Sequence, residues 1–284
     1  MNHYPFTSRY FELPEGKIHY IDEGQGEVIV FSHGTPEWSF AYRHFIRALL
    51  PHYRCIALDH FGFGLSDKPA DGDYTIQRQA ARFEAFLRHL NLDHLTLVAN
   101  DFGVSIALSY ALNYPEHIRR ICISNGWMWS LKSDPHFARP GKLLQGWIGK
   151  LLYIHLNFSV SVMMSNGYGD KNKLSKEILQ YYQKPFSKKK DRKATLVYAR
   201  EILNASDWWQ YQWNRIDRLQ HIPIQLCWGM QDKFLRISEL QNWKARLSNV
   251  HVTEFPCGHF PHEEEPEQMI SVLKEFLKIK PAQA

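Results

Sequence analysis

Short apolar runs that alternate with amphipathic helical patterns restrict the fold of this chain more than any other feature of its sequence. The runs lie at residues 28–31, 53–58, 94–99, 118–124 and 222–228, and each has the length of a strand. Because they are continuously apolar, these strands are expected to be buried on both faces, as in parallel sheets. The helical patterns lie at residues 40–50, 75–90, 104–113, 237–247 and 263–279. The alternation predicts the α/β class, with a mostly parallel sheet flanked by helices.

Alternating apolar and polar residues at 9–13 and 17–21 flank a turn, which predicts an antiparallel hairpin before the first parallel strand. A last strand is expected at residues 250–255. In sheets of this class, ligands bind beyond the carboxyl ends of the strands. Functional side chains are therefore expected directly after strand ends.

A long segment after the sixth strand interrupts the alternation. It contains aromatic-rich helical patterns at 142–154, 175–182 and 194–204, joined by polar loops. The segment is too long for a plain connection between consecutive strands. We therefore expect a core domain of residues 1–125 and 221–284, and a helical cap of residues 126–220 that closes a site at the carboxyl edge of the sheet.

Charge and cysteine patterns favour a cytoplasmic protein without nucleic-acid, membrane or metal partners. The net charge is +5, and the one dense basic cluster, residues 184–193, lacks interleaved aromatic residues, so it is interpreted as a solvated loop. The four cysteines, Cys55, Cys122, Cys227 and Cys257, have no metal-ligand spacing and fit buried thiols in a reducing compartment. Residues 1–10 do not resemble a secretory signal, and no apolar run is long enough to span a membrane. The oligomeric state is left open.

Residues 95–105, LTLVANDFGVS, have the layout of a nucleophile elbow, a sharp strand-to-helix turn that pushes one side chain into the site. Ala99 and Gly103 supply the small residues that such a turn requires around Asp101. A simple N-cap role is the alternative for this aspartate. Ser105 lies one turn inside the predicted helix, where its hydroxyl can bond to a backbone carbonyl, so it is rejected as the nucleophile.

An aspartate at the elbow selects the chemistry. A carboxylate that attacks a saturated carbon forms an ester, which a general base and an oxyanion hole can hydrolyse. A serine would instead leave an ether that water does not readily cleave. Asp101 thus favours haloalkanes, epoxides or strained lactones as small apolar substrates.

A base and an acid are expected late in the chain. His259 stands in PCGHFPH (residues 256–262), on the loop after the strand at 250–255, whereas His262 opens the next helix among glutamates and is expected on the surface. Asp232, in WGMQD after the preceding strand, is the orienting acid, although a turn aspartate is the alternative. Asn125, after the sixth strand, carries no charge, so it is not an alternative to Asp232 as the orienting acid. The order nucleophile, acid, base is the order that follows an elbow of this kind.

The loop HGTPEWSF (residues 33–40) also follows a strand end. Its position assigns the oxyanion hole to the backbone N–H groups of Thr35 and Phe102. Pro36 is a candidate for a cis peptide bond, with an ordinary turn as the commoner alternative. The Gly-x-Gly of residues 62–64 lacks the third glycine of a dinucleotide site and is interpreted as a loop at the rim of the sheet.

Together, HGTPEWSF, GFGLSDKP (residues 62–69), the aspartate elbow, the Asp232 motif and GHF (residues 258–260) resemble the haloalkane dehalogenases of the α/β-hydrolase superfamily. The match spans residue 9 to the last helix and is weakest in the cap; epoxide hydrolases share most of the motifs. The resemblance implies a helical cap and a mechanism without cofactor or metal, in which Asp101 displaces halide and His259 then activates water.

The residue after the nucleophile departs from that family, where a Trp holds the leaving halide. Here it is Phe102, and Thr35 stands where many relatives have an Asn donor. Trp127 and Trp129 could supply indole donors from the cap side, although packing in the cap is the alternative for both. Trp38 and Phe260, within the matching motifs, are further candidates for contact with substrate or halide.

Three functions remain open from the sequence. Halide displacement is favoured; the opening of an epoxide or a strained lactone is the alternative, and a non-catalytic binding module is the third. Epoxide opening needs acid donors for the leaving oxygen. The cap supplies candidates in Tyr153, Tyr168, Tyr181, Tyr182 and Tyr211.

Overall fold

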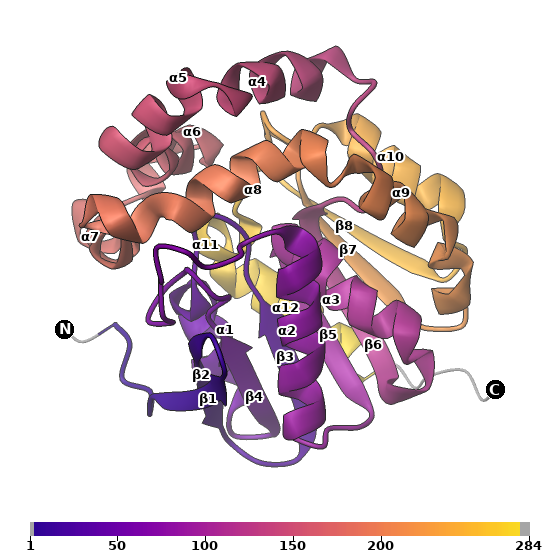
Figure 1. The fold of residues 1–284 in the computed structure, drawn as a ribbon. Coiled ribbons are helices and arrows are strands. Elements are labelled where there is room, and N and C mark those ends of the chain that lie inside the picture. Colours follow the sequence, from indigo (N-terminus) through magenta and orange to yellow (C-terminus); the bar gives the residue numbers. More distant parts are fainter. Residues whose placement is uncertain (1–2, 279–284) are drawn as a thin grey trace.

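Eight strands form one sheet in the computed structural model, which describes residues 3–278 (Figure 1). Their order is β1-β2-β4-β3-β5-β6-β7-β8; β2 is antiparallel to β1 and β4, and all other neighbours are parallel. The strands are β1 (Arg9–Leu13), β2 (Gly16–Glu23), β3 (Glu27–Ser32), β4 (Tyr53–Leu58), β5 (Leu95–Asp101), β6 (Ile118–Gly126), β7 (Ile224–Gly229) and β8 (Val250–Phe255). The predicted fold class is confirmed.

The helices of the α/β part cover both faces of the sheet (Figure 1). They are α1 (Arg43–Leu49), α2 (Ile76–His89), α3 (Phe102–Asn113), α10 (Ile237–Arg246), α11 (Pro261–Glu264) and α12 (Pro266–Phe276). α3 is apolar all round, because α2 and α9 (Ser206–Asn214) pack against the sides that do not face the sheet. This central position fixes the first turn of α3, which follows Asp101 directly.

The chain between β6 and β7 folds into short helices that lie over the upper edge of the sheet in Figure 1. They include α4 (Pro135–Gln145), α5 (Trp147–Lys150), α6 (Met164–Gly167), α7 (Lys176–Gln183) and α8 (Lys193–Asn204). Two π-helical turns, η3 (Leu151–His155) and η4 (Ser159–Met163), lie between α5 and α6. We call residues 127–223 the inserted segment.

Two predicted helices are divided in the structure. The pattern at 142–154 is split because Gly146 adopts an extended conformation (φ −85°, ψ −162°) between α4 and α5. The pattern at 263–279 is split into α11 and α12 at Glu265, since the proline that follows disfavours a helical conformation there. Residue 279, the predicted end of this pattern, lies outside the described residues.

Candidate active site

Asp101 stands at the junction of β5 and α3 with φ +49° and ψ −130°, a conformation that L-residues rarely adopt. Neighbouring glycines make this turn possible. A Cβ on Gly103 would lie 2.2 Å from the Ser32 carbonyl oxygen, and one on Gly34 would lie 2.4 Å from the Asp101 Cβ. The local sequence therefore builds a strained turn that projects the Asp101 side chain away from the backbone.

The two oxygens of the Asp101 carboxylate have different surroundings. Oδ2 accepts a hydrogen bond from the Thr35 backbone N–H at 2.9 Å, and the Phe102 backbone N–H also donates to this carboxylate. Oδ1 lies 3.9 Å from Nε2 of His259. Oδ2 is thus held by the Thr35 backbone N–H, while Oδ1 stands next to the His259 imidazole. The peptide bond between Thr35 and Pro36 is cis, the isomer considered from the sequence.

His259 lies beside Asp232, the residue predicted from the sequence as its acid partner. Its Nδ1 lies 2.7 Å from Asp232 Oδ2, and both side chains are buried. Asp232 Oδ2 also accepts from Asn125 Nδ2 at 2.7 Å, and its Oδ1 accepts from the Phe234 backbone N–H at 2.7 Å. Asn125 and the Phe234 backbone thus hold the Asp232 carboxylate in place beside the His259 ring.

The environment shifts the pKa values of Asp101 and His259. Burial, together with the Glu37 charge, raises the pKa of Asp101 to about 6, although His259 and the backbone donors oppose this shift. Burial lowers the pKa of His259, but the charge and hydrogen bond of Asp232, with help from Asp101, raise it to about 9. At neutral pH the resting site thus holds an ionised Asp101 beside a protonated His259.

A buried pair beneath the site corrects one prediction. His262 was expected on the surface, but its side chain has no exposed area, and its Nε2 lies 2.6 Å from Oε1 of the equally buried Glu37. Glu37 Oε2 accepts from Asn100 Nδ2 at 2.6 Å, and Asn100 Oδ1 accepts from the Gly34 backbone N–H at 3.2 Å. The pair thus ties the loop after β3 to the residue that precedes Asp101. His262 stays inside because Glu37, which lies far away in sequence, supplies its partner.

A cavity of about 240 Å³ opens above Asp101 and His259, between the sheet and the inserted segment. Its lining is mostly apolar and comes from the loop after β3, the elbow, the loops after β7 and β8, and helices of the inserted segment. Such a volume suits a small organic molecule. Two buried donors in the lining, Thr35 Oγ1 and Trp127 Nε1, have no hydrogen-bond partner.

The candidate substrate-contacting residues divide into two groups. Trp127 and Phe260 line the cavity, as do Thr35 and Phe102, the two candidates for the oxyanion hole. Trp38 does not line it; its ring packs on Tyr4, with centroids 4.8 Å apart. Trp129 does not line it either, because its ring packs between Trp213 and Trp243. For Trp129, the packing alternative is therefore the one that the structure supports, and Trp38, a candidate for substrate contact, lies outside the cavity wall.

Only one of the five candidate tyrosines, Tyr153, is among the described residues that line the cavity. Tyr168, Tyr181, Tyr182 and Tyr211 lie elsewhere. Burial, with the nearby Asp101 charge, raises the pKa of Tyr153 to about 12, so its phenol keeps its proton at neutral pH. Ser105 is buried and donates to the Phe102 carbonyl at 2.9 Å, in agreement with its rejection as the nucleophile.

Two supporting residues are absent from the sequence-based site. Asn125 was considered only as an absent acid, yet it donates to Asp232 and accepts from the Gly229 backbone N–H at 2.8 Å. Glu264 accepts from the backbone N–H groups of Gly258 and Gly169, at 2.8 and 2.9 Å, and so joins the His259 loop to the inserted segment. Asn125 follows the predicted strand at 118–124, and this position could have identified it as a site residue. No sequence feature could have identified Glu264 in the same way.

Within residues 3–278, no cluster of three or more His, Cys, Asp or Glu side chains is arranged to hold a metal ion.

Comparison with known proteins is consistent with this geometry. The family model described as alpha/beta hydrolase fold matches residues 27–266. A cis-3-alkyl-4-alkyloxetan-2-one decarboxylase from Shewanella oneidensis is 34% identical, covering 96% of this chain and 89% of the relative. Haloalkane dehalogenase 2 from Mycobacterium tuberculosis is 29% identical, covering 96% and 95%. The crystal structure of haloalkane dehalogenase DatA from Agrobacterium tumefaciens superposes with a TM-score of 0.85 at 27% identity, covering 95% and 96%.

Proposed function

The chain belongs to the alpha/beta hydrolase fold family, and from that premise we propose that it is a haloalkane dehalogenase-like hydrolase with Asp101 as its nucleophile. One observation carries the proposal. The Asp101 carboxylate lies at the floor of an apolar cavity, with Oδ2 on the Thr35 backbone N–H and Oδ1 beside His259 Nε2. Carboxylate attack on a saturated carbon is the chemistry that this placement serves.

The proposed reaction has two steps. Asp101 Oδ1 forms a bond to the substrate carbon while the bond from carbon to the leaving group breaks, and the leaving group departs with the electron pair. His259 then takes a proton from water, and the resulting hydroxide attacks Cγ of the ester. The negative charge that develops on Oδ2 is stabilised by the N–H groups of Thr35 and Phe102. Collapse of this intermediate breaks the ester C–O bond, the leaving alkoxide takes the proton from His259 and departs as the alcohol, and the new Asp101 carboxyl group returns a proton to His259.

The first step prepares His259 for the second. The ionised Asp101 is one cause of the raised pKa of His259. Once Asp101 is an ester, that charge is gone, and the pKa of His259 falls. Formation of the ester thus favours the neutral imidazole that general-base catalysis requires.

The inserted segment is proposed to act as the cap over this reaction. Its residues supply most of the cavity wall that faces Asp101. A closed apolar wall strengthens the interactions of the charged groups inside and limits access of water. We therefore retain residues 126–220 as the proposed cap and residues 1–125 and 221–284 as the proposed core.

Trp127 is the proposed donor to the leaving group. Its Nε1 is buried in the cavity wall without a partner, and its ring lies 4.8 Å from the Phe102 ring. Trp127→Phe should lower the rate of bromide release from a short bromoalkane by about tenfold to a hundredfold, because a donor to the departing charge is lost. Halide release and bromide affinity measure this effect.

Trp209→Phe is the matched control for this prediction. Trp209 also has a buried Nε1 without a partner and packs on Trp127 at 5.1 Å, but it does not line the cavity. Trp209→Phe should change the rate of bromide release only a few-fold. Equal losses in both variants would mean that packing, and not the indole N–H of Trp127, explains the result.

A strained four-membered lactone is the second candidate substrate. The Phe102 side chain cannot donate a hydrogen bond to a halide. Because the opening of a strained ring releases energy, it needs less stabilisation of the leaving group by hydrogen-bond donors. The relative from Shewanella oneidensis is named for a reaction on such a ring. Here Asp101 would attack the saturated ring carbon that is bonded to the ring oxygen. The bond between that carbon and the ring oxygen would break, which opens the ring and leaves a carboxylate on the substrate. Loss of carbon dioxide would then expel Asp101 and leave an alkene, without water.

An assay panel separates these candidates. Bromide release from bromoalkanes supports the first, and alkene formation with carbon dioxide from a cis-dialkyl oxetanone supports the second. Epoxide opening remains a third outcome, with Tyr153 as its acid donor, and Tyr153→Phe should then abolish diol formation. Absence of all three activities at high enzyme concentration would contradict the proposed chemistry.

Glu37 is proposed as a positioning residue that also sets the pH range. Activity requires ionised Asp101, whose pKa is raised to about 6, so kcat/KM should fall as the pH decreases through this value. The Glu37 charge is one cause of the raised pKa. Glu37→Gln should therefore move this acid limb to lower pH, and a pH profile of kcat/KM measures it. A uniform loss of activity with an unmoved limb would assign Glu37 a packing role alone.

A further inference from the structure

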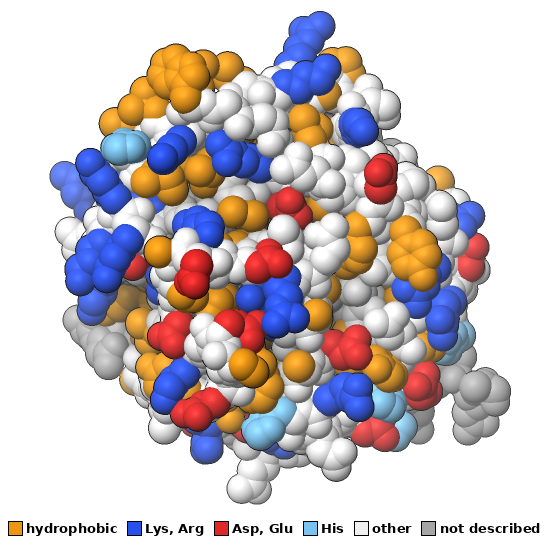
Figure 2. Space-filling model, viewed as in Figure 1, with side chains coloured by type: hydrophobic (Ala, Val, Ile, Leu, Met, Phe, Trp, Pro, Cys, Tyr) orange, Lys and Arg blue, Asp and Glu red, His pale blue; other side chains and the backbone are white. Residues whose placement is uncertain are grey.

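The outer face of residues 143–162 carries large apolar side chains in contact with solvent. Five of the eleven exposed large hydrophobic side chains described lie in this stretch, namely Leu143, Trp147, Leu151, Leu156 and Val162. The side chain of Trp147 is 74% exposed, the highest value of the eleven. Figure 2 shows hydrophobic side chains gathered at the upper left, over the position of α5 in Figure 1. Contiguous exposed apolar surface of this kind marks an interaction site.

The core of the protein does not explain these side chains. The inner side of the same stretch already supplies cavity-lining residues, namely Leu144, Tyr153 and Ser159. A small separate cluster of buried residues, Tyr153, Leu196 and Ala199, holds the stretch against α8. The stretch is therefore apolar on both sides, and only its inner side has partners within the chain.

Positive charge surrounds this apolar surface. Between Asp134 and Asp170 the sequence contains no acidic residue, whereas Arg139, Lys142 and Lys150 are exposed there. In Figure 2, Lys, Arg and His side chains lie directly below the hydrophobic patch. We call this apolar surface and its cations the basic apolar face.

The basic cluster at 184–193 adds to the same face. It was interpreted as a solvated loop, but it forms two short 3-10 helices, η6 (Lys184–Phe186) and η7 (Lys189–Arg192), and the first residue of α8. Arg192 donates to the carbonyl oxygens of Ile154 and His155, at 2.9 and 3.3 Å. These bonds hold η7, with its exposed Lys189 and Lys190, beside η3.

We propose that the basic apolar face docks on the surface of an anionic lipid membrane. Trp147 and the leucines would enter the boundary between headgroups and acyl chains, and the lysines would lie among the phosphates. No helix of the described chain is long and apolar enough to cross a membrane, so the contact is peripheral. The proposal departs from the expectation of no membrane partner. A second copy of the chain fits less well, because two such faces would bring like charges together.

Docking in this way would place one wall of the cavity against the lipid. Leu143 and Leu144 are consecutive residues of α4, and the first is exposed while the second lines the cavity. An apolar substrate dissolved in the bilayer would then reach the cavity across a single layer of protein. The docking itself does not depend on the proposed reaction.

Vesicle co-sedimentation tests the proposal with the full-length chain. Vesicles of equal parts phosphatidylcholine and phosphatidylglycerol should bind the protein, whereas pure phosphatidylcholine should bind it far more weakly. Trp147→Ser should weaken binding to the anionic vesicles about tenfold. Lys142→Glu and Lys150→Glu should each weaken it by about fivefold or more, and added salt should do the same.

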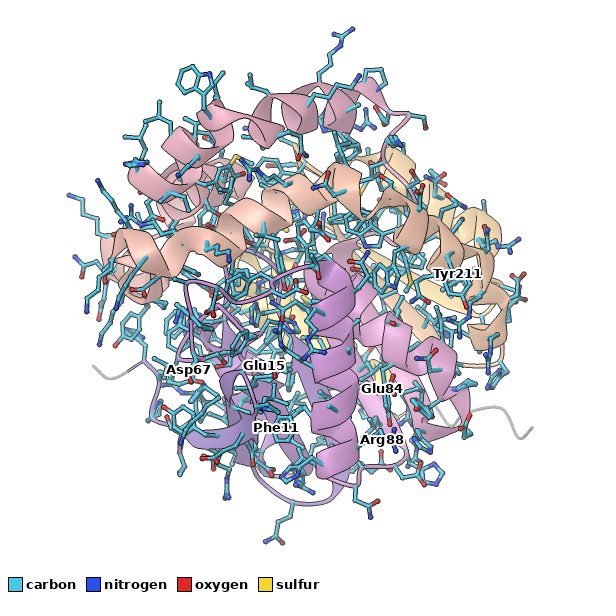
Figure 3. The ribbon with its side chains drawn as sticks, in the orientation of Figure 1. Phe11, Glu15, Asp67, Glu84, Arg88 and Tyr211 are labelled. Carbon is cyan, nitrogen blue, oxygen red and sulfur yellow. The ribbon has the colours of Figure 1, made fainter. Side chains whose placement is uncertain are left out.

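Matched controls use exposed residues on other faces. Tyr211, 59% exposed, lies on α9, away from α5, and Tyr211→Ser should not change binding (Figure 3). Lys244→Glu on α10 and Lys274→Glu on α12 repeat the charge change away from the basic apolar face. Turnover of a water-soluble substrate should be unchanged in the Trp147 and Lys142 variants, which shows that they are folded.

Three outcomes would overturn the proposal. The first is a protein that binds neither vesicle. The second is binding that Tyr211→Ser and Lys244→Glu weaken as much as Trp147→Ser and Lys142→Glu. The third is dimerisation in solution that Trp147→Ser abolishes, in the absence of vesicle binding, which would assign this face to a second copy.

Discussion

Asp101→Ala should lower turnover by at least about 10⁴-fold, because the bond to the substrate carbon can no longer form. No other carboxylate replaces it. Asp232 is held by Asn125 and His259, and Glu37 lies beneath the site on Asn100 and His262. The loss should appear in kcat and in the single-turnover rate alike. Steady-state and stopped-flow assays on the same substrate measure both.

Two controls accompany this variant. Ser105→Ala should retain activity within a few-fold, since the Ser105 hydroxyl bonds only to the carbonyl of the preceding turn. The thermal unfolding curve of Asp101→Ala should match that of the wild type, so that loss of activity is not loss of fold. Residual activity of Asp101→Ala near the wild-type level would assign the nucleophile elsewhere.

His259→Gln should separate the two steps of the reaction. Steady-state turnover of a bromoalkane should fall by about 10³- to 10⁴-fold, because water at the ester is no longer activated. The first bromide should still be released in an amount equal to the enzyme, since His259 takes no part in bond formation to carbon. A rapid-quench assay of bromide against time measures this burst.

The burst also distinguishes the candidate substrates. With a strained lactone, loss of carbon dioxide frees Asp101 without water, so His259→Gln should still turn over. A variant that releases no bromide in the first turnover, while the wild type is active, would show that His259 acts before the ester forms.

The strand ends and the elbow were predictable from sequence because local patterns determine them. Continuous apolar runs identify the parallel strands, and small residues around Asp101 identify the sharp turn. Since parallel strands place their carboxyl ends at one edge, the positions of Asp101, Asp232 and His259 after strand ends were enough to bring them together. The structure places His259 between the other two, 3.9 Å from one and 2.7 Å from the other.

Partners distant in sequence could not be predicted in the same way. The motif at 256–262 does not indicate that His262 is buried. Its burial depends on the contact with Glu37, which lies on the loop after β3 and is distant in sequence. The same limit applies to the aromatic residues. Trp127 and Trp129 are two positions apart, yet one lines the cavity and the other packs between Trp213 and Trp243. The backbone conformation after β6 determines which of the two side chains faces the cavity. Hydrophobic periodicity does not predict that conformation.

The ester on Asp101 is the central claim, and intact-mass spectrometry of His259→Gln tests it most directly. The variant is incubated with a short bromoalkane that the wild type turns over, digested, and mapped by peptide sequencing. We expect one alkyl group for each chain, on the peptide that contains Asp101, and none in the double variant that also carries Asp101→Ala. Failure to find any alkylated peptide, or an alkyl group on a different residue, would contradict it.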